Sequence, residues 1–195
     1  MTAFATRTEF YAWAAHRLAE LDAGLAAMEA ELAVSQGPPA TASRLAMDTA
    51  RLWRDRFAAC IRLADSGAAF RDAIPGLQES WAQFEIAMEN WALAAEQKNV
   101  AFDARAKALL GVWHAAAAAY KAQALTAAGG QRTRIEAAIA RLERDAAAYS
   151  EKFEDLKDAG KLSWVAMGQA LKDSRAVFER DSDTALAALA DARKH

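Results

Sequence analysis

The side chains best suited to metal or nucleophilic chemistry are few in this sequence. The three histidines are His16, His114 and His195, and the single cysteine is Cys60. Neither His16 nor His114 belongs to the Glu-x-x-His pairs of a di-metal bundle, and neither has a Cys or His at ligand spacing. Cys60 has no histidine or asparagine in the context that a cysteine hydrolase uses. We therefore expect no metal site, no cofactor and no catalytic residue.

The tripeptide Gly129-Gly130-Gln131 is similar to the catalytic loop of peptide-release factors. However, the following residues, RTRIEAAIARL, begin a helix with heptad spacing, and the αβ surroundings of that loop are absent. The paired glycines suit the left-handed cap of a turn between two helices. The sequence also has no Gly-rich phosphate loop, nucleophile elbow or paired catalytic carboxylates. The expectation is a protein that is not an enzyme.

The tryptophans are the residues most open to a functional interpretation. Their side chains could anchor helix interfaces, stack on a ligand or insert at a lipid or polymer surface. Trp81 and Trp91 lie in the core register of their segment, so we expect them to be structural. Trp13 lies off the seam of its helix, which makes it the expected partner-binding residue. The full set is Trp13, Trp53, Trp81, Trp91, Trp113 and Trp164.

The elements that would position these side chains are long helices. Of the 195 residues 54 are Ala, whereas only 9 are Gly and 3 are Pro, so helix breaks are sparse. The clear breaks are SQGPPATAS and TAAGGQRTR, with weaker ones at Gly67 and Pro75-Gly76. They predict helices over residues 3–34, 42–73, 77–128 and 131–191. The expected fold is all-α: an elongated bundle of about four long antiparallel helices with coiled-coil-like packing, in a single domain over 1–195 that could divide into hairpins 1–75 and 76–195.

Apolar residues in these segments recur at alternating spacings of three and four, which is the pattern of a coiled-coil seam. In the first segment the seam is Tyr11, Ala14, Leu18, Leu21, Leu25, Met28 and Leu32. The third segment has a seam through Trp81 and Trp91 and, beside it, a second stripe of Ile86, Leu93 and Val100. A helix with two apolar stripes needs more than one neighbour. This pattern favours a bundle that forms a homodimer.

The fourth segment interrupts its own seam at Gly160. Counting four residues twice, from Leu156 through Gly160 to Trp164, restores the pattern, which is the signature of a stutter in a continuous helix. Gly160 is therefore predicted to lie where the seam shifts, at a close helix crossing or a kink. Trp164 is predicted to be the first large residue buried after the shift.

Residues 151–181 resemble a family of short bacterial coiled-coil proteins associated with stress responses. In that family a charged heptad helix runs through Leu-Lys-x-Ala-Gly to a Trp and an amphipathic helix. The resemblance covers about a quarter of the chain and implies a helical scaffold with no enzymatic activity. The matching positions are Leu156, Lys157, Ala159, Gly160, Trp164, Ala170, Ala176 and Phe178.

Charge and hydropathy exclude several classes of partner. The net charge is −2, without the basic patch of a nucleic-acid-binding protein. The N-terminus lacks the pattern of a signal peptide, and the longest uncharged apolar run, Ala108 to Tyr120, is too short to span a bilayer. We expect a cytoplasmic protein with no nucleic-acid partner and no transmembrane segment.

Three functions remain open at this point. The first is a non-enzymatic helical scaffold or protein-interaction protein that self-associates and binds another, unidentified protein. The second is an amphipathic protein that coats a granule or lipid surface; the Ala-rich helices and scattered aromatics look similar to those of the phasins of storage granules. The third is a bundle with an internal pocket for a small molecule or cofactor, which could be an enzyme.

Overall fold

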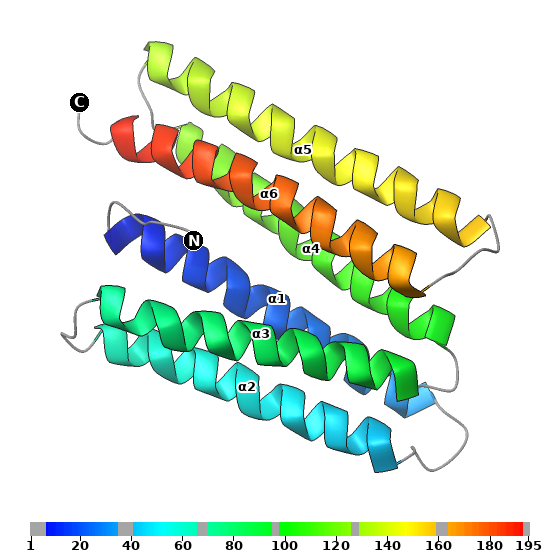
Figure 1. Cartoon of the computed structure of the whole chain (residues 1–195). Coiled ribbons are helices and arrows are strands. Elements are labelled where there is room, and N and C mark those ends of the chain that lie inside the picture. Colours follow the sequence, from blue (N-terminus) through cyan, green and yellow to red (C-terminus); the bar gives the residue numbers. More distant parts are fainter. Residues whose placement is uncertain are drawn as a thin grey trace. The chain divides into compact units, whose positions relative to one another are not determined.

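The computed structural model is entirely helical over the residues that it describes, which are 7–34, 41–65, 70–94, 98–125, 129–158 and 164–192 (Figure 1). Within these ranges there are six helices and no strand, so the all-α prediction is confirmed. The helices are α1 (Arg7–Val34), α2 (Thr41–Asp65), α3 (Phe70–Ala94), α4 (Lys98–Ala124), α5 (Gly129–Asp158) and α6 (Trp164–Ala192).

The prediction of about four long helices with coiled-coil-like packing is wrong. The expected helix over residues 77–128 is interrupted, because α3 ends at Ala94 and α4 begins at Lys98. The expected helix over 131–191 is likewise two helices, since α5 ends at Asp158 and α6 begins at Trp164 and packs along it. Apolar spacing of three and four occurs in any amphipathic helix, so two helices in similar register can imitate a single long one.

The expected break at Pro75-Gly76 is also wrong. Pro75 lies inside α3, about one turn after its start at Phe70. A proline there removes one backbone hydrogen bond near the helix end, at an exposed position where water can reach the backbone. The break lies earlier, between Asp65 and Phe70, where the sequence contains Gly67.

The chain forms two compact units, which we call the N-terminal unit (Phe10–Leu109) and the C-terminal unit (Leu110–His195 with residues 1–9). The earlier prediction of a single domain over residues 1–195 stays a prediction. In the N-terminal unit, α2 and α3 form a closely packed antiparallel hairpin, which is visible in Figure 1. The unit also contains α1, which packs against both helices, and the first part of α4 up to Leu109, where Arg105 forms a 2.7 Å ion pair with Glu85 of α3.

In the N-terminal unit, α1 contacts α3 along a column of residues seven apart. The ring of Phe10 lies 5.3 Å from that of Phe70. One heptad later, the Arg17 guanidinium lies 4.5 Å from the Trp81 ring centroid, and the next heptad position is Gly24, against Phe84 and Met88. The column 10–17–24 is therefore the side of α1 that faces α3. Of the predicted seam, Ala14, Leu21 and Met28 are fully buried, as their spacing indicates, whereas Tyr11, Leu18, Leu25 and Leu32 are half-buried.

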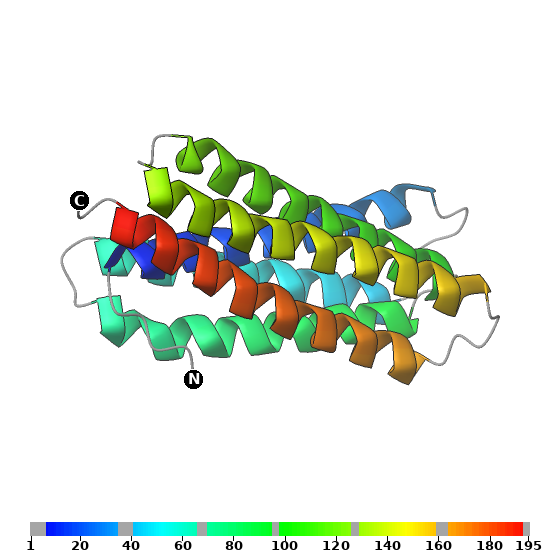
Figure 2. The same ribbon diagram turned by 90° about the horizontal axis from the view of Figure 1, so that it is seen from above.

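The C-terminal unit is built around an aromatic cluster with one residue from each helix. Trp113 of α4 stacks on Phe178 of α6 with ring centroids 4.8 Å apart, and it lies 5.4 Å from Tyr149 of α5. Figures 1 and 2 both show α5 and α6 side by side. The predicted seam of α5 is buried, as its spacing indicates: Ile135, Ile139, Leu142, Ala146, Tyr149 and Phe153.

Candidate functional site

The structure places the predicted tryptophan sites in different environments. Trp91 is 1% exposed and belongs to the core of the N-terminal unit. Trp81 is half-buried under Arg17. Trp13, the expected partner-binding residue, is half-buried, with its ring 6.2 Å from that of Phe57. Trp13 therefore contributes to the contact between α1 and α2.

The predictions for Gly160 and Trp164 concern the connection between α5 and α6. Gly160 lies outside the described residues. Trp164 is the first residue of α6, and its side chain is likewise outside the described part of the chain. The close crossing and the burial that the sequence predicts at these two positions stay predictions.

One ion pair of the N-terminal unit is almost fully buried. Arg17 and Glu20, three residues apart on α1, form an ion pair of 2.9 Å with side chains 5% and 2% exposed. Burial lowers the pKa of the neighbouring His16, although the Glu20 carboxylate opposes this effect. Burial favours the neutral form of the imidazole, and the Glu20 carboxylate compensates the buried charge of the Arg17 guanidinium. These residues form a polar contact inside the helix interface.

The nucleophile candidates are poorly activated. Burial raises the pKa of the Cys60 thiol, and the nearby Glu79 carboxylate raises it further. Burial also raises the pKa of Tyr120 to about 12, while its hydroxyl shares a 2.7 Å hydrogen bond with Ser182. A nucleophile or base needs a pKa shifted the other way, toward neutrality. Neither shift favours the deprotonated form of Cys60 in α2 or of Tyr120 in α4.

The structure brings together one pair of carboxyl groups that the sequence does not suggest, Asp145 of α5 and Asp181 of α6. Their hydrogen bond raises the pKa of Asp145, with burial and the Asp181 charge acting in the same direction. Asp181 is buried, yet its hydrogen bonds to Asp145 and Arg180 hold its own pKa below the usual value. The two groups bind protons as a pair at the α5–α6 contact.

The remaining chemical candidates lie apart from one another. His114 is exposed on α4, and Gly129 and Gly130 form the start of α5. Within the described ranges, no group of three His, Cys, Asp or Glu side chains could hold a metal ion. In the same part of the chain, no helix has the length and apolar character needed to cross a membrane.

The most distinctive surface feature is a set of large aliphatic side chains exposed on the α2–α3 hairpin. In α2, residues 45, 52 and 63 are separated by seven and eleven positions, which places them on one face of a helix. In α3, residues 86 and 93 are seven apart. We call this set the outer strip: Leu45, Leu52, Leu63, Ile86 and Leu93, which are 66%, 50%, 63%, 50% and 48% exposed.

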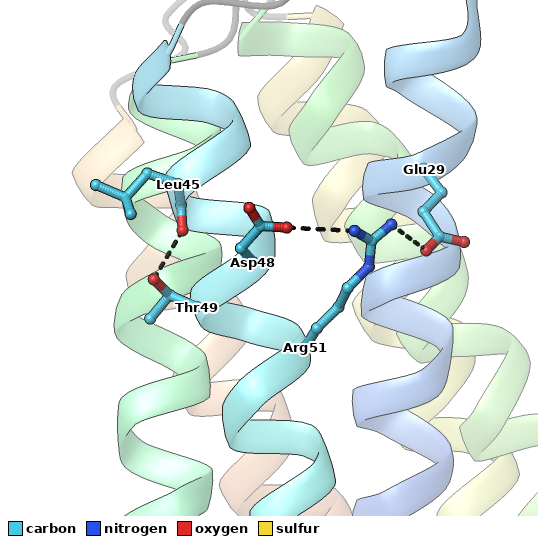
Figure 3. Close-up of polar contacts among 5 residues, drawn as sticks. All are labelled: Glu29, Leu45, Asp48, Thr49 and Arg51. Carbon is cyan, nitrogen blue, oxygen red and sulfur yellow. Dashed lines mark hydrogen bonds and ion pairs between the residues drawn. The ribbon is translucent and has the colours of Figure 1, made fainter.

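The outer strip faces away from α1. Figure 3 shows Leu45 pointing to one side of α2, while Arg51 on another side forms ion pairs with Asp48 and with Glu29 of α1. Arg54 makes a second ion pair to α1, 2.6 Å from Asp22. These charged contacts mark the side of α2 that faces α1, next to its buried face with Ala50 and Phe57. The leucine face of α2 is turned away from α1.

Ile86 and Leu93 belong to the second stripe predicted from the sequence, whereas the matching leucines of α2 were not predicted. Their spacing of seven and eleven was the signal that could have revealed them. No protein-family model, no curated protein and no solved structure matches the chain. The candidate site therefore rests on the geometry of this surface.

Proposed function

We propose that this chain is a non-enzymatic helical interaction protein of the cytoplasm, which associates with itself and serves as a scaffold for a further protein. The observation that carries the proposal is the outer strip. Five large aliphatic side chains about half exposed or more on one hairpin are an apolar patch of the kind that marks protein contacts. Covering such a patch gains the hydrophobic free energy that drives most protein association.

The environments of the polar residues support the same proposal. Cys60 and Tyr120 have pKa values raised by burial, and Arg17 and Glu20 are joined in a buried ion pair. The raised pKa values do not favour a nucleophile or base, and the ion pair lies inside the helix interface. The resemblance of residues 151–181 to the short coiled-coil family implies a helical scaffold and points in the same direction.

Sedimentation equilibrium of the full chain tests the self-association. We expect a mass above that of the monomer, 21.0 kDa, at micromolar concentration. High salt should preserve the association, because burial of apolar surface is not screened by ions. A monomer mass over the whole micromolar range would contradict the proposed self-association.

A further inference from the structure

The outer strip lies on one flat face formed jointly by α2 and α3. On α2, Cys60 faces α3, whereas Arg51 and Arg54 face α1. At 100° per residue, the strip leucines lie beside the α3-facing side and away from the α1-facing side. On α3, Gly76 faces α2, whereas Phe84 and Met88 face α1. By the same 100° rotation per residue, Ile86 and Leu93 lie beside the α2-facing side and away from the α1-facing side. The five side chains therefore share the face of the hairpin that is opposite α1.

Residues of the strip stand at matching heights on the two helices. A Cβ atom on Gly76 would lie 3.0 Å from the Cys60 sulfur, so these two residues are level in the antiparallel pair. Leu52 is eight residues before Cys60, and Ile86 is ten residues after Gly76. By the same count Leu45 stands near Leu93. The strip thus contains two cross-helix pairs, Leu52 with Ile86 and Leu45 with Leu93. In each pair the heights along the helix axis differ by about two residues, or 3 Å.

The size of this face fits an interface with another folded chain. From Leu45 to Leu63 the strip is about 27 Å long, and two adjacent helices present a face about 20 Å wide. A standard interface buries about 800 Å² on each partner, and the smaller stable ones bury about 600 Å². The hairpin face with its flanking residues approaches that area, so a second copy could cover it completely.

The charges along the face differ between the two helices. On α2, Asp48 and Asp55 are paired with Arg51 and Arg54 of the same helix. Outside these pairs, α2 has three exposed basic residues, Arg44, Arg56 and Arg62, and one exposed acidic residue, Asp65. On α3, the exposed acidic residues are Asp72, Glu79 and Glu89, with one exposed basic residue, Arg71. As whole helices, α2 is therefore relatively basic and α3 relatively acidic, and Arg56 and Glu79 are close to the strip on their helices.

We propose that a second copy of this chain covers the outer strip, with a two-fold axis parallel to the hairpin helices. This inference rests on the proposed function, and it specifies its surface and geometry. A rotation of 180° about an axis in the interface, parallel to the helices, places α2 over the partner's α3 at unchanged height. Leu52 then packs on the partner's Ile86, and Leu45 packs on the partner's Leu93.

The same geometry matches opposite charges between the copies. Arg56 is four residues beyond Leu52 and lies over the Trp53 ring, with its guanidinium 4.5 Å from the ring centroid. Glu79 is seven residues before Ile86 on the same face of α3. Across the two-fold axis Arg56 approaches the partner's Glu79, and the contact occurs twice. An anionic lipid surface would instead be repelled by the acidic α3 side.

Charge reversal at these two positions tests the arrangement. Arg56→Glu places like charges at both contacts of the dimer, and Glu79→Arg does the same with the opposite sign. We expect each variant alone to dissociate about tenfold more readily than the wild type. An equal mixture of the two variants should restore the dimer, because each mixed dimer contains two opposite-charge contacts. Arg56 and Glu79 are exposed, and circular dichroism would confirm that both variants remain folded.

Native mass spectrometry measures the amounts of the mixed dimer and of the two homodimers, because the two variants differ in mass. Enrichment of the mixed dimer over both homodimers is the expected result. In either variant, residues 56 and 79 of the same chain have like charges. An opposite-charge contact between these two positions can therefore form only between the two different variants. Lys172→Glu and Glu151→Arg, at exposed positions of the C-terminal unit, are matched controls that should leave dimerisation unchanged and give a statistical mixture.

Different failures have different meanings. A wild-type dimer that neither variant weakens would overturn the proposed surface and leave the self-association intact. Weakened homodimers without enrichment of the mixed dimer would overturn the placement of α2 over the partner's α3. A monomeric wild type would overturn both the surface and the self-association. If that monomer bound polyester granules or phosphatidylcholine vesicles through its strip leucines, the outer strip would be covered by a granule or lipid surface and not by a second copy.

Discussion

Gly24 of α1 allows a quantitative test of how closely α1 and α3 pack. In an open helix, Gly→Ala stabilises by about 1 kcal/mol, because Ala loses less backbone entropy. At Gly24 the added Cβ atom would lie 3.2 Å and 3.3 Å from two ring carbons of Phe84 and 3.5 Å from the terminal methyl of Met88. Phe84 is 2% exposed and Met88 is fully buried, so neither side chain has free space into which it could move.

Crowding of this kind in a packed core costs about 1 to 3 kcal/mol, which exceeds the gain in helix propensity. We therefore expect Gly24→Ala to lower the free energy of unfolding by about 1 kcal/mol. The matched control is Gly111→Ala in α4, where nothing lies within 4 Å of the added atom and the residue is exposed. That variant should be more stable than the wild type by about 0.5 to 1 kcal/mol.

Urea denaturation followed by circular dichroism measures both variants. The slope of the transition should stay constant, so that the midpoint reports stability alone. Equal stabilisation by the two alanines would refute the close contact of α1 with Phe84. It would place α1 farther from α3 than the column of Phe10, Arg17 and Gly24 indicates.

Two further predictions concern the C-terminal unit. Trp113→Ala removes a side chain that is 1% exposed and stacked on Phe178, so we expect a loss of about 3 to 5 kcal/mol in urea denaturation; a loss below about 1 kcal/mol would contradict the aromatic core. Asp145→Asn keeps a donor for Asp181 and removes the repulsion between two carboxylates, so it should be more stable than the wild type at pH 7. Because the folded-state pKa of Asp145 is raised, protonation stabilises the wild-type fold at low pH, and this contribution is lost as the pH rises through that pKa. The advantage of Asp145→Asn should therefore shrink on acidification toward pH 4, and an advantage that is constant with pH would refute the pairing.

The all-α fold and much of the core follow from local sequence. The seam of α5, from Ile135 to Phe153, could be read from its spacing, because a helix with one apolar stripe has one way to bury it. Sparse Gly and Pro likewise indicated long helices. Spacing does not reveal where two helices in similar register are separated, and so the breaks after Ala94 and Asp158 were not predicted.

The candidate site needed the tertiary structure. Ile86 and Leu93 form a recognisable stripe in the sequence, but an apolar stripe can be buried or exposed according to which neighbour covers it. The apolar face of α2 with Ala50 and Phe57 is buried against its neighbours, and Arg51 and Arg54 form ion pairs with α1. Leu45 and its companions are therefore left on the outer face. Contacts between residues more than twenty positions apart therefore determine which stripe of the helix is exposed. Local propensity contains no information about them, whereas the packing of three helices determines which stripe remains exposed.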